Sequence, residues 1–401
     1  MILIQNFGQI IFGNILELLF SVNGLFLIFL FINLYHILLY LFRDRNFAAH
    51  LKTFHDVSVD SISQLKEIPL INIIIPAWKE GEDFRLCLDS IEQLCYPKLK
   101  IIVNAGGFEE TIEIANSFKE RKSFNVIYQK EGEGKIKAIN DCLNFVSDGI
   151  ICLLDADILI DDKILLDMLF PLTNGEEKIV MAPLFPHTSI LNNDFVKYVY
   201  INRDKKFRQK FTRYTYGVAS NACIKYEVIK KIGRFSEKRM ADDGISTGRD
   251  LSLKGIKTYL LSDKKIQSLT YPTKIKNYIQ QNARWIENFL LSTPKNRKFR
   301  ILKFSVLAII SIFILVFPFF ILLNINIVLL GLLIMYSFYL KKIRKIFFYK
   351  LVDKSNPIKF KPVFYIKLVF FIYIDKIINI IAFFETLFYR KAYKRRKNLI
   401  P

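Results

Sequence analysis

Cysteine is scarce in this sequence, with five residues in 401, and their spacing matches no metal-binding pattern. An odd, small number of thiols also argues against a secreted fold held together by disulfides. Several of them lie in apolar runs, which is typical of reduced core residues in a cytosolic domain. The five are Cys87, Cys95, Cys142, Cys152 and Cys223.

Other features are missing as well, and each absence excludes a class of protein. The chain contains no internal repeat and no low-complexity linker. The first long apolar stretch has no basic region before it and no small-residue cleavage site after it, unlike a secretion signal. The turn at residues 131–135 lacks the glycine spacing and the following hydroxyl of a P-loop, and it is not a dinucleotide-binding fingerprint.

Acidic residues are outnumbered by basic ones, 37 to 58, which gives a net charge of +21. Lys and Arg cluster beside apolar segments, as the positive-inside bias and anionic lipids require, so we expect a membrane partner and no nucleic acid. With 52% hydrophobic and 24% charged residues, the chain is too apolar for an ordinary soluble enzyme and too charged for membrane helices alone. A soluble domain flanked by membrane segments satisfies both figures.

Three apolar stretches are long enough to span a membrane, at residues 25–42 with those just before, 301–322 and 327–340. Basic residues follow the first stretch (Arg43, Arg45) and the third (341–345), which places both of these ends in the cytoplasm. We therefore predict an integral protein of the cell membrane with a cytoplasmic middle domain.

Two further segments are predicted to lie at the membrane surface. Residues 363–388 are apolar but carry four charged residues and precede a basic run, so a spanning helix would place that run outside. An interfacial or re-entrant helix is favoured there. Residues 195–216 mix aromatic with basic side chains, which favours a helix lying on the membrane over a solvated helix with core aromatics.

The middle of the chain alternates short apolar runs with helical patterns, which predicts an α/β domain with a parallel, helix-covered sheet. The expected strands are 71–75 (ended by Pro76), 100–103, 125–128, 149–154 and 178–182, with helices at 83–94 and 111–120. The predicted domains are an N-terminal membrane segment (1–45), the α/β domain (46–295), a membrane hairpin (296–345) and a basic C-terminal segment (346–401).

Two carboxylates end the most apolar of these strands. Residues 149–154 read as a strand buried on both faces, and Asp155 and Asp157 follow it directly. Side chains two apart on an extended segment leave the same face, so both can reach one cation at the carboxyl end of the sheet. Oxygen ligands of this kind suit Mg²⁺ or Mn²⁺, with substrate phosphates completing the shell.

Five segments in order along the chain resemble the inverting family 2 glycosyltransferases, in their membrane-bound polysaccharide-synthase and ceramide-glucosyltransferase-like branch. The resemblance covers roughly residues 70–290 and implies a GT-A-like (Rossmann-related) fold on the cytoplasmic side, flanked by transmembrane helices. The segments are residues 73–80 (Ile-Ile-Ile-Pro-Ala-Trp-Lys-Glu), 134–140 (Gly-Lys-Ile-Lys-Ala-Ile-Asn), Asp155-Ala-Asp157, Ala241-Asp242-Asp243 and Gln281-Asn-Ala-Arg284-Trp285.

The resemblance also implies roles for individual residues. Asp243 would be the base that deprotonates the acceptor hydroxyl, with Asp242 tuning it; helix capping is the alternative for this pair. The metal ligands would be Asp157 and Asp155. Donor contacts would come from Pro76, Glu80, Asn104, Lys135, Asp155 and Arg284, and acceptor contacts from Gln281 and Trp285. For Lys135 the alternative is a solvated helix-start lysine, and for Arg284 and Trp285 a membrane-anchored amphipathic helix.

One departure from the family pattern weakens the choice of nucleotide. The family usually follows its second strand with Asp-Asp-Gly-Ser, whose acid reads the base, whereas this chain has Asn104 in Val-Asn-Ala-Gly-Gly. Unlike the carboxylate of the family pattern, an amide both donates and accepts hydrogen bonds; a UDP-sugar is the favoured donor.

The predicted function is transfer of a sugar from a nucleotide donor to a lipid or a growing polysaccharide, with inversion. Addition of a single sugar to a membrane lipid is held nearly level with polysaccharide synthesis. From another class, a catalytically silent membrane scaffold is disfavoured by the intact Asp155, Asp157, Asp243 and Trp285. A transporter or channel is disfavoured by the long polar middle.

Overall fold

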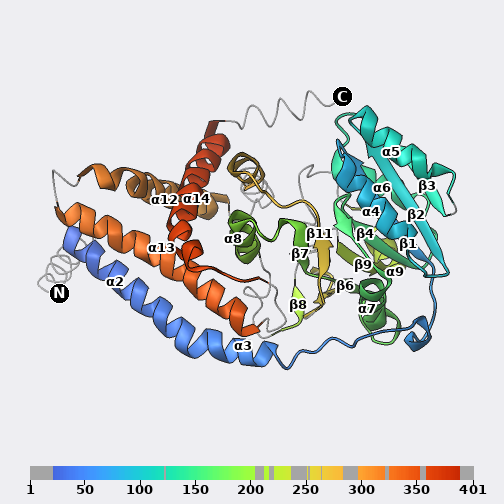
Figure 1. Cartoon of the computed structure of the whole chain (residues 1–401), viewed down its shortest axis with the longest axis horizontal. Helices are drawn as coiled ribbons and strands as arrows, with labels where there is room; N and C mark the ends of the chain where they lie inside the picture. Colours follow the sequence, from blue (N-terminus) through green and yellow to red (C-terminus); the bar gives the residue numbers. More distant parts are fainter. Residues whose placement is uncertain are drawn as a thin grey trace, which may run out of the picture. The chain divides into compact units, whose positions relative to one another are not determined.

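A computed structural model describes residues 21–121, 123–203, 212–215, 221–235, 251, 253–262, 264–282, 297–320, 325–352 and 358–388. These residues form two compact units. The α/β unit contains the described residues within Leu51–Thr273, and the helical unit contains those within Met1–His50 and Lys274–Phe388. Figure 1 shows the elements of both units.

The α/β unit is built on an eight-stranded sheet with the order β3-β2-β1-β4-β9-β6-β10-β8. Its strands are β1 (Ile71–Trp78), β2 (Leu99–Gly106), β3 (Phe124–Tyr128), β4 (Ile150–Leu154), β6 (Ile179–Met181), β8 (Tyr214–Thr215), β9 (Asn221–Lys225) and β10 (Thr258–Leu260). A second, three-stranded sheet has the order β5-β11-β7, with β5 (Ile158–Leu159), β7 (Leu184–Pro186) and β11 (Ile266–Ser268).

The large sheet is mixed, which corrects the prediction of a parallel sheet. Strands β3, β2, β1 and β4 are parallel neighbours, as the alternation with helices predicted. Strand β9 runs antiparallel to both β4 and β6, and β8 runs antiparallel to β10. The fold therefore combines a parallel half with a mixed half, the α/β arrangement expected of a GT-A-like domain.

Helices cover both faces of the sheet, and successive residues of β1 show why. Ile73 and Ile75 pack in one core cluster with α4 (Glu82–Glu92), α5 (Glu109–Lys119) and α7 (Asp162–Thr173). Ile74 packs in a second cluster with α6 (Gly134–Leu143) and α9 (Tyr226–Ile232). Because side chains alternate across a strand, a continuous run of isoleucine buries both faces, as in a helix-covered parallel sheet.

Strand β1 does not end at Pro76, contrary to the sequence prediction. It continues to Trp78, with Pro76 opposite Asn104 and Trp78 opposite Gly106 in the parallel pairing with β2. The pairing with β4 on the other side ends earlier, at Ile74 opposite Leu153. Pro76 therefore lies where one side of β1 has no neighbour, and a residue without an N–H is tolerated there.

Helix α8 (Asp194–Arg203) is an internal helix of the α/β unit, so the prediction that residues 195–216 lie on the membrane is wrong for residues 195–203. All residues from Phe195 to Ile201 are buried within the protein, and Tyr198 is only 2% exposed. Its aromatic side chains serve the core. The remainder of the predicted segment lies largely outside the described residues.

The helical unit contains three helices that are long and apolar enough to cross a membrane, at Asn23–Leu51, Leu302–Phe319 and Ile325–Val352. They comprise α2 (Val22–Leu38) with its continuation through a π-helical turn (Leu39–Asp44) into α3 (Arg45–Leu51), then α12 (Arg297–Val316), and α13 (Ile325–Val352). Helices α2 and α13 pack side by side and run in the same direction (Figure 1). Their basic ends, Arg43 and residues 341–345, therefore lie at the same end of the pair.

The last helix, α14 (Pro362–Phe388), is not among the three candidate spans. It packs against α12 and α13, and Figure 1 shows it crossing them. Phe364, Leu368 and Phe371 are buried on one side, whereas Ile366 and Phe370 are exposed on another. The interfacial position of this helix stays a prediction.

Candidate active site

The centre of the large sheet is the point where the strand order changes direction. From β1 the chain moves outward to β2 and β3, and it then returns to β4 on the other side of β1. Loops that leave such neighbouring strands diverge, and they open a crevice at the carboxyl ends of the strands where open α/β sheets bind ligands. Glu80 follows β1 at this edge, and Asp155 follows β4.

Lys135 reaches this edge from the first turn of α6 and forms an ion pair with Oδ1 of Asp155. Both side chains are about one-third exposed, at 30% and 35%. The pair joins two of the segments that carry the family resemblance, although they lie 20 residues apart. Lys135 is thus paired with a carboxylate, and its contact with the donor stays a prediction.

Asp157 is fixed by hydrogen bonds from strand β11, a contact that no sequence pattern predicts. Its Oδ2 accepts a hydrogen bond of 2.9 Å from Oγ of Ser268, and its backbone carbonyl accepts one of 2.8 Å from the N–H of Leu269. Ser268 ends β11 and lies 111 residues further along the chain. A lone serine in a short strand carries no recognisable signal, so only the fold reveals this contact.

The carboxylates of this edge repel one another. Burial, with the neighbouring Asp157 and Asp155 charges, raises the pKa of Glu80 to about 7. Burial, with the Asp155 charge, raises the pKa of Asp157 to about 6, and the hydrogen bond from Ser268 opposes that rise. Lys135 lowers both pKa values, but it does not cancel the excess of negative charge.

This excess of negative charge fits a divalent cation. Among the residues that the structure describes, no group of three or more His, Cys, Asp or Glu side chains could enclose a metal ion. Mg²⁺ and Mn²⁺ do not need such a cage, because they are commonly held by one or two carboxylates together with substrate phosphates. Asp155 and Asp157 provide that partial set.

We expect the affinity for Mn²⁺ to depend on pH through Asp157. Because the pKa of Asp157 is raised to about 6, a proton occupies its carboxylate below that pH and a cation must displace it. The affinity should be nearly constant above about pH 7 and fall roughly tenfold per unit below about pH 5.5, as release of one proton per ion requires. Electron paramagnetic resonance titration measures this, and an affinity unchanged between pH 8 and pH 5 would contradict it.

Glu80 is held by its backbone. Its N–H donates to Oγ1 of Thr111 at 2.8 Å, and the same hydroxyl donates to the Glu80 carbonyl at 2.6 Å. Thr111 lies in α5 and is fully buried, so this two-way contact ties the turn after β1 to the helix after β2. The main chain at Glu80 is thereby fixed, and its carboxylate is close enough to Asp155 and Asp157 for their charges to raise its pKa.

Asn104 has a structural contact that the sequence did not indicate. It is 1% exposed, and its Nδ2 donates to the Ala138 carbonyl of α6 at 3.2 Å. Its Oδ1 is buried without a hydrogen-bond partner. The amide therefore ties β2 to the helix that carries Lys135, and the role of Asn104 in reading a base stays a prediction, as does the donor contact of its half-buried neighbour Pro76.

The remaining predicted residues lie outside the described part of the α/β unit. Asp242, Asp243, Arg284 and Trp285 lie outside the described residues. Gln281 is described and half-buried, but it belongs to the helical unit. The assignments of base and acceptor contacts thus rest on the sequence alone.

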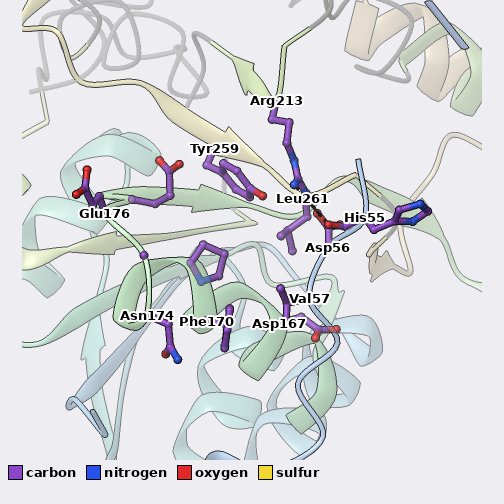
Figure 2. A pocket seen from close by; sticks show the side chains of 13 residues that line it. His55, Asp56, Val57, Asp167, Phe170, Asn174, Glu176, Arg213, Tyr259 and Leu261 are labelled. Atoms are coloured by element: carbon purple, nitrogen blue, oxygen red, sulfur yellow. Dashed lines mark hydrogen bonds and ion pairs between the residues drawn. The ribbon is translucent and has the colours of Figure 1, made fainter. Parts of the chain in front are cut away.

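A separate cavity of about 310 Å³ contains none of the predicted site residues. Figure 2 shows Arg213 extending toward Asp56 at one side of it, and the two side chains form an ion pair. Asp56 also accepts a hydrogen bond from the N–H of Ser262 at 2.6 Å. The Arg213 guanidinium lies 4.7 Å from the centre of the Tyr259 ring. These contacts fasten the segment after α3 to the sheet, so we assign the cavity no chemistry.

Comparison with known proteins identifies a matching family and several similar proteins. The sequence profile described as "Glycosyltransferase like family 2" matches residues 69–288, more than half of the chain. The probable glycosyltransferase YdaM of Bacillus subtilis is 25% identical over 236 residues, 55% of this chain and 56% of its own length. The poly-beta-1,6-N-acetyl-D-glucosamine synthase of Staphylococcus epidermidis is 31% identical over 101 residues, 25% of this chain and 24% of its own.

The chain thus spans about half the length of the first of these curated relatives and about a quarter of the second. Among solved structures, the mannosyltransferase PcManGT of Pyrobaculum calidifontis, in complex with GDP-Man and Mn²⁺, has a TM-score of 0.55 at 16% identity. The alignment covers 91% of this chain and 99% of the mannosyltransferase chain. At this identity the likeness concerns the fold.

Proposed function

The chain belongs to the glycosyltransferase-like family 2, and from this premise we propose that it is a membrane-bound, inverting glycosyltransferase. It would move a sugar from a nucleotide donor to a lipid or a growing glycan on the cytoplasmic face. The observation that carries this proposal is the meeting of Glu80, Lys135, Asp155 and Asp157 at the switch point of the sheet. A nucleotide diphosphate and a divalent cation together complement those charges.

In this proposal Asp155 and Asp157 hold Mg²⁺ or Mn²⁺, which supplies charge neutralisation to the departing diphosphate. Lys135 restrains Asp155 and adds positive charge beside the phosphates. Asp243 removes the proton from the acceptor hydroxyl, with Asp242 tuning its proton affinity. Arg284 contacts the donor phosphates, while Gln281 and Trp285 contact the acceptor; an aromatic face suits a sugar ring.

The nucleotide and the acceptor are narrower proposals. A UDP-sugar is favoured by the family resemblance, and the GDP-Man bound to the mannosyltransferase of the same fold makes GDP-sugars the next choice. The similarity to a polysaccharide synthase supports a glycan acceptor. The three candidate membrane spans in the described part of the chain offer few helices for a translocation channel, which supports a single sugar added to a lipid.

A catalytically silent scaffold explains the adjacent carboxylates of Asp155 and Asp157 less well than an enzyme does. Burying Asp157 beside Asp155 raises its pKa to about 6, so its ionised form destabilises the fold at neutral pH. A scaffold gains nothing from that cost, whereas an enzyme that binds a cation does. Local destabilisation of this kind is typical of functional sites.

A screen of nucleotide sugars tests the proposal. Purified protein in vesicles of native lipids, with Mn²⁺, should release nucleotide from one donor, with UDP-sugars the first expectation. Vesicles of a synthetic phospholipid, which lack the native lipids that would serve as acceptor, separate transfer from slow donor hydrolysis. Absence of release from every donor, in protein shown to be folded, would instead favour the scaffold.

The topology can be tested with single cysteines in a background where the exposed Cys95 is replaced by serine. Cysteines replacing Lys345 and Lys397 should resist an impermeant thiol reagent added to intact cells, because both basic segments are predicted to be cytoplasmic. A cysteine replacing Asn326, in the first turn of α13, should react and serves as the control. Rapid labelling at position 397 would mean that α14 crosses the membrane.

A further inference from the structure

Ser268 has one strong hydrogen-bond acceptor within reach, and that acceptor is Asp157. The serine is 3% exposed, and a buried hydroxyl needs a partner. Its Oγ lies 2.9 Å from Oδ2 of Asp157 and 3.4 Å from the Thr270 carbonyl. A hydroxyl has one proton, and a charged acceptor at the shorter distance holds it more strongly.

The backbone around Ser268 is held from both sides. Strand β11 pairs antiparallel with β5, placing Ser268 opposite Ile158, and parallel with β7, placing it opposite Pro186. The Ser268 carbonyl also accepts a hydrogen bond of 2.9 Å from the N–H of His187. A hydroxyl mounted on a central strand has little freedom, and such rigid elements position functional groups better than loops do.

The same strand also fixes the backbone of Asp157. The N–H of Leu269 donates to the Asp157 carbonyl at 2.8 Å, beside the hydroxyl contact to the carboxylate. Main chain and side chain of Asp157 are therefore both set by two consecutive residues of the β11 end. Asp155, by contrast, is restrained through Lys135.

We propose that Ser268 is the positioning residue of the cation site: its hydroxyl holds one carboxylate oxygen of Asp157 and leaves the other for the metal. The inference rests on the proposed function, because it takes Asp157 to be a metal ligand. Groups that orient a metal ligand in this way commonly change metal affinity by about 10- to 100-fold when removed. Ser268 itself contacts neither metal nor substrate in this scheme.

Three substitutions in the full-length protein separate positioning from a general effect on the strand. Ser268→Ala removes the hydroxyl, Ser268→Thr keeps it on a side chain suited to strands, and Gln267→Ala alters the exposed neighbouring residue. In Mn²⁺ titrations at pH 7.5, where Asp157 is ionised, Ser268→Ala should bind at least roughly tenfold more weakly. Ser268→Thr and Gln267→Ala should stay within about twofold of the parent, since neither removes the hydrogen bond.

The outcomes distinguish this inference from the proposed function. Unchanged Mn²⁺ affinity in Ser268→Ala, with affinity lost in Asp157→Asn, would overturn the positioning role and leave the metal site intact. Unchanged affinity in both variants would overturn the metal site itself. If Ser268→Ala does not fold, Ser268→Cys replaces it, because a thiol is only a weak donor, and parent-like Mn²⁺ affinity there would also overturn the inference.

Discussion

Replacing Asp157 with asparagine is expected to abolish metal-dependent nucleotide binding and to lower sugar transfer by roughly 10³-fold, since cation help at a leaving group is worth several kcal/mol. The amide keeps the shape of the carboxylate and can still accept the hydrogen bond from Ser268. It cannot supply the negative charge. Titration of the nucleotide with and without Mn²⁺, together with the transfer rate, measures both effects.

The same variant should be more stable than the parent protein in the absence of metal. The pKa of Asp157 is raised from 3.8 to about 6 in the folded protein, so its ionised form opposes folding as the pH rises through that range. At pH 7.5 the asparagine should therefore increase the free energy of unfolding, by up to about 3 kcal/mol. Higher stability with lost activity is the pattern of a functional rather than a structural carboxylate.

A matched control exists in Asp83, an exposed carboxylate whose charge also raises the pKa of Glu80. Asp83→Asn removes one negative charge from the same region, and it should leave both metal dependence and transfer nearly unchanged. Equal losses in the two variants would mean that general electrostatics, rather than ligation by Asp157, explain the effect. Full parent activity in excess EDTA would show that the two-aspartate site holds no required metal.

Replacing Asp243 with asparagine should lower transfer by at least roughly 10²-fold while donor affinity and fold stay nearly normal, the low end of a general-base contribution. An amide can still accept a hydrogen bond at a helix start, so a capping role would survive the change. It cannot take a proton from a hydroxyl, so a base role would not. The rate of transfer at saturating donor and the donor affinity are the two measurements.

Asp242→Asn is the comparison variant, and its loss should be smaller, because Asp242 would only tune its neighbour. Near-normal turnover in Asp243→Asn would return the pair to helix capping. A larger loss in Asp242→Asn than in Asp243→Asn would exchange the two roles.

The features of the α/β unit that the sequence predicts correctly are those that depend on residues close together along the chain. The apolar run predicted as a buried strand forms β4 at residues 150–154 and is buried throughout, so Asp155 and Asp157 lie just beyond the carboxyl end of a strand. The motif at residues 134–140 singles out Lys135, and in the structure this lysine pairs with Asp155. Hydrophobic period and motif order suffice for such features, because each is set by residues close in sequence.

The features that the sequence did not reveal depend on distant partners. A proline normally ends a strand. Pro76, however, lies beyond Ile74, the last residue of β1 that pairs with β4, so the missing N–H is tolerated. The aromatic and basic side chains of α8 suited a membrane surface equally well, and only tertiary packing shows that they are buried. Ser268 donates a hydrogen bond to Asp157, 111 residues earlier in the chain, and nothing in the short sequence of β11 predicts this contact.

The direct test of a metal-dependent nucleotide-sugar transferase is incorporation of labelled sugar into lipid or polymer by the purified protein in native-lipid vesicles. Each donor is supplied first with EDTA and then with Mn²⁺ added in excess over the chelator. We predict no incorporation with EDTA and full incorporation from one donor once Mn²⁺ is restored. Incorporation that proceeds equally in EDTA would contradict the role assigned to Asp155 and Asp157, and a lack of incorporation from every donor would contradict the transfer itself.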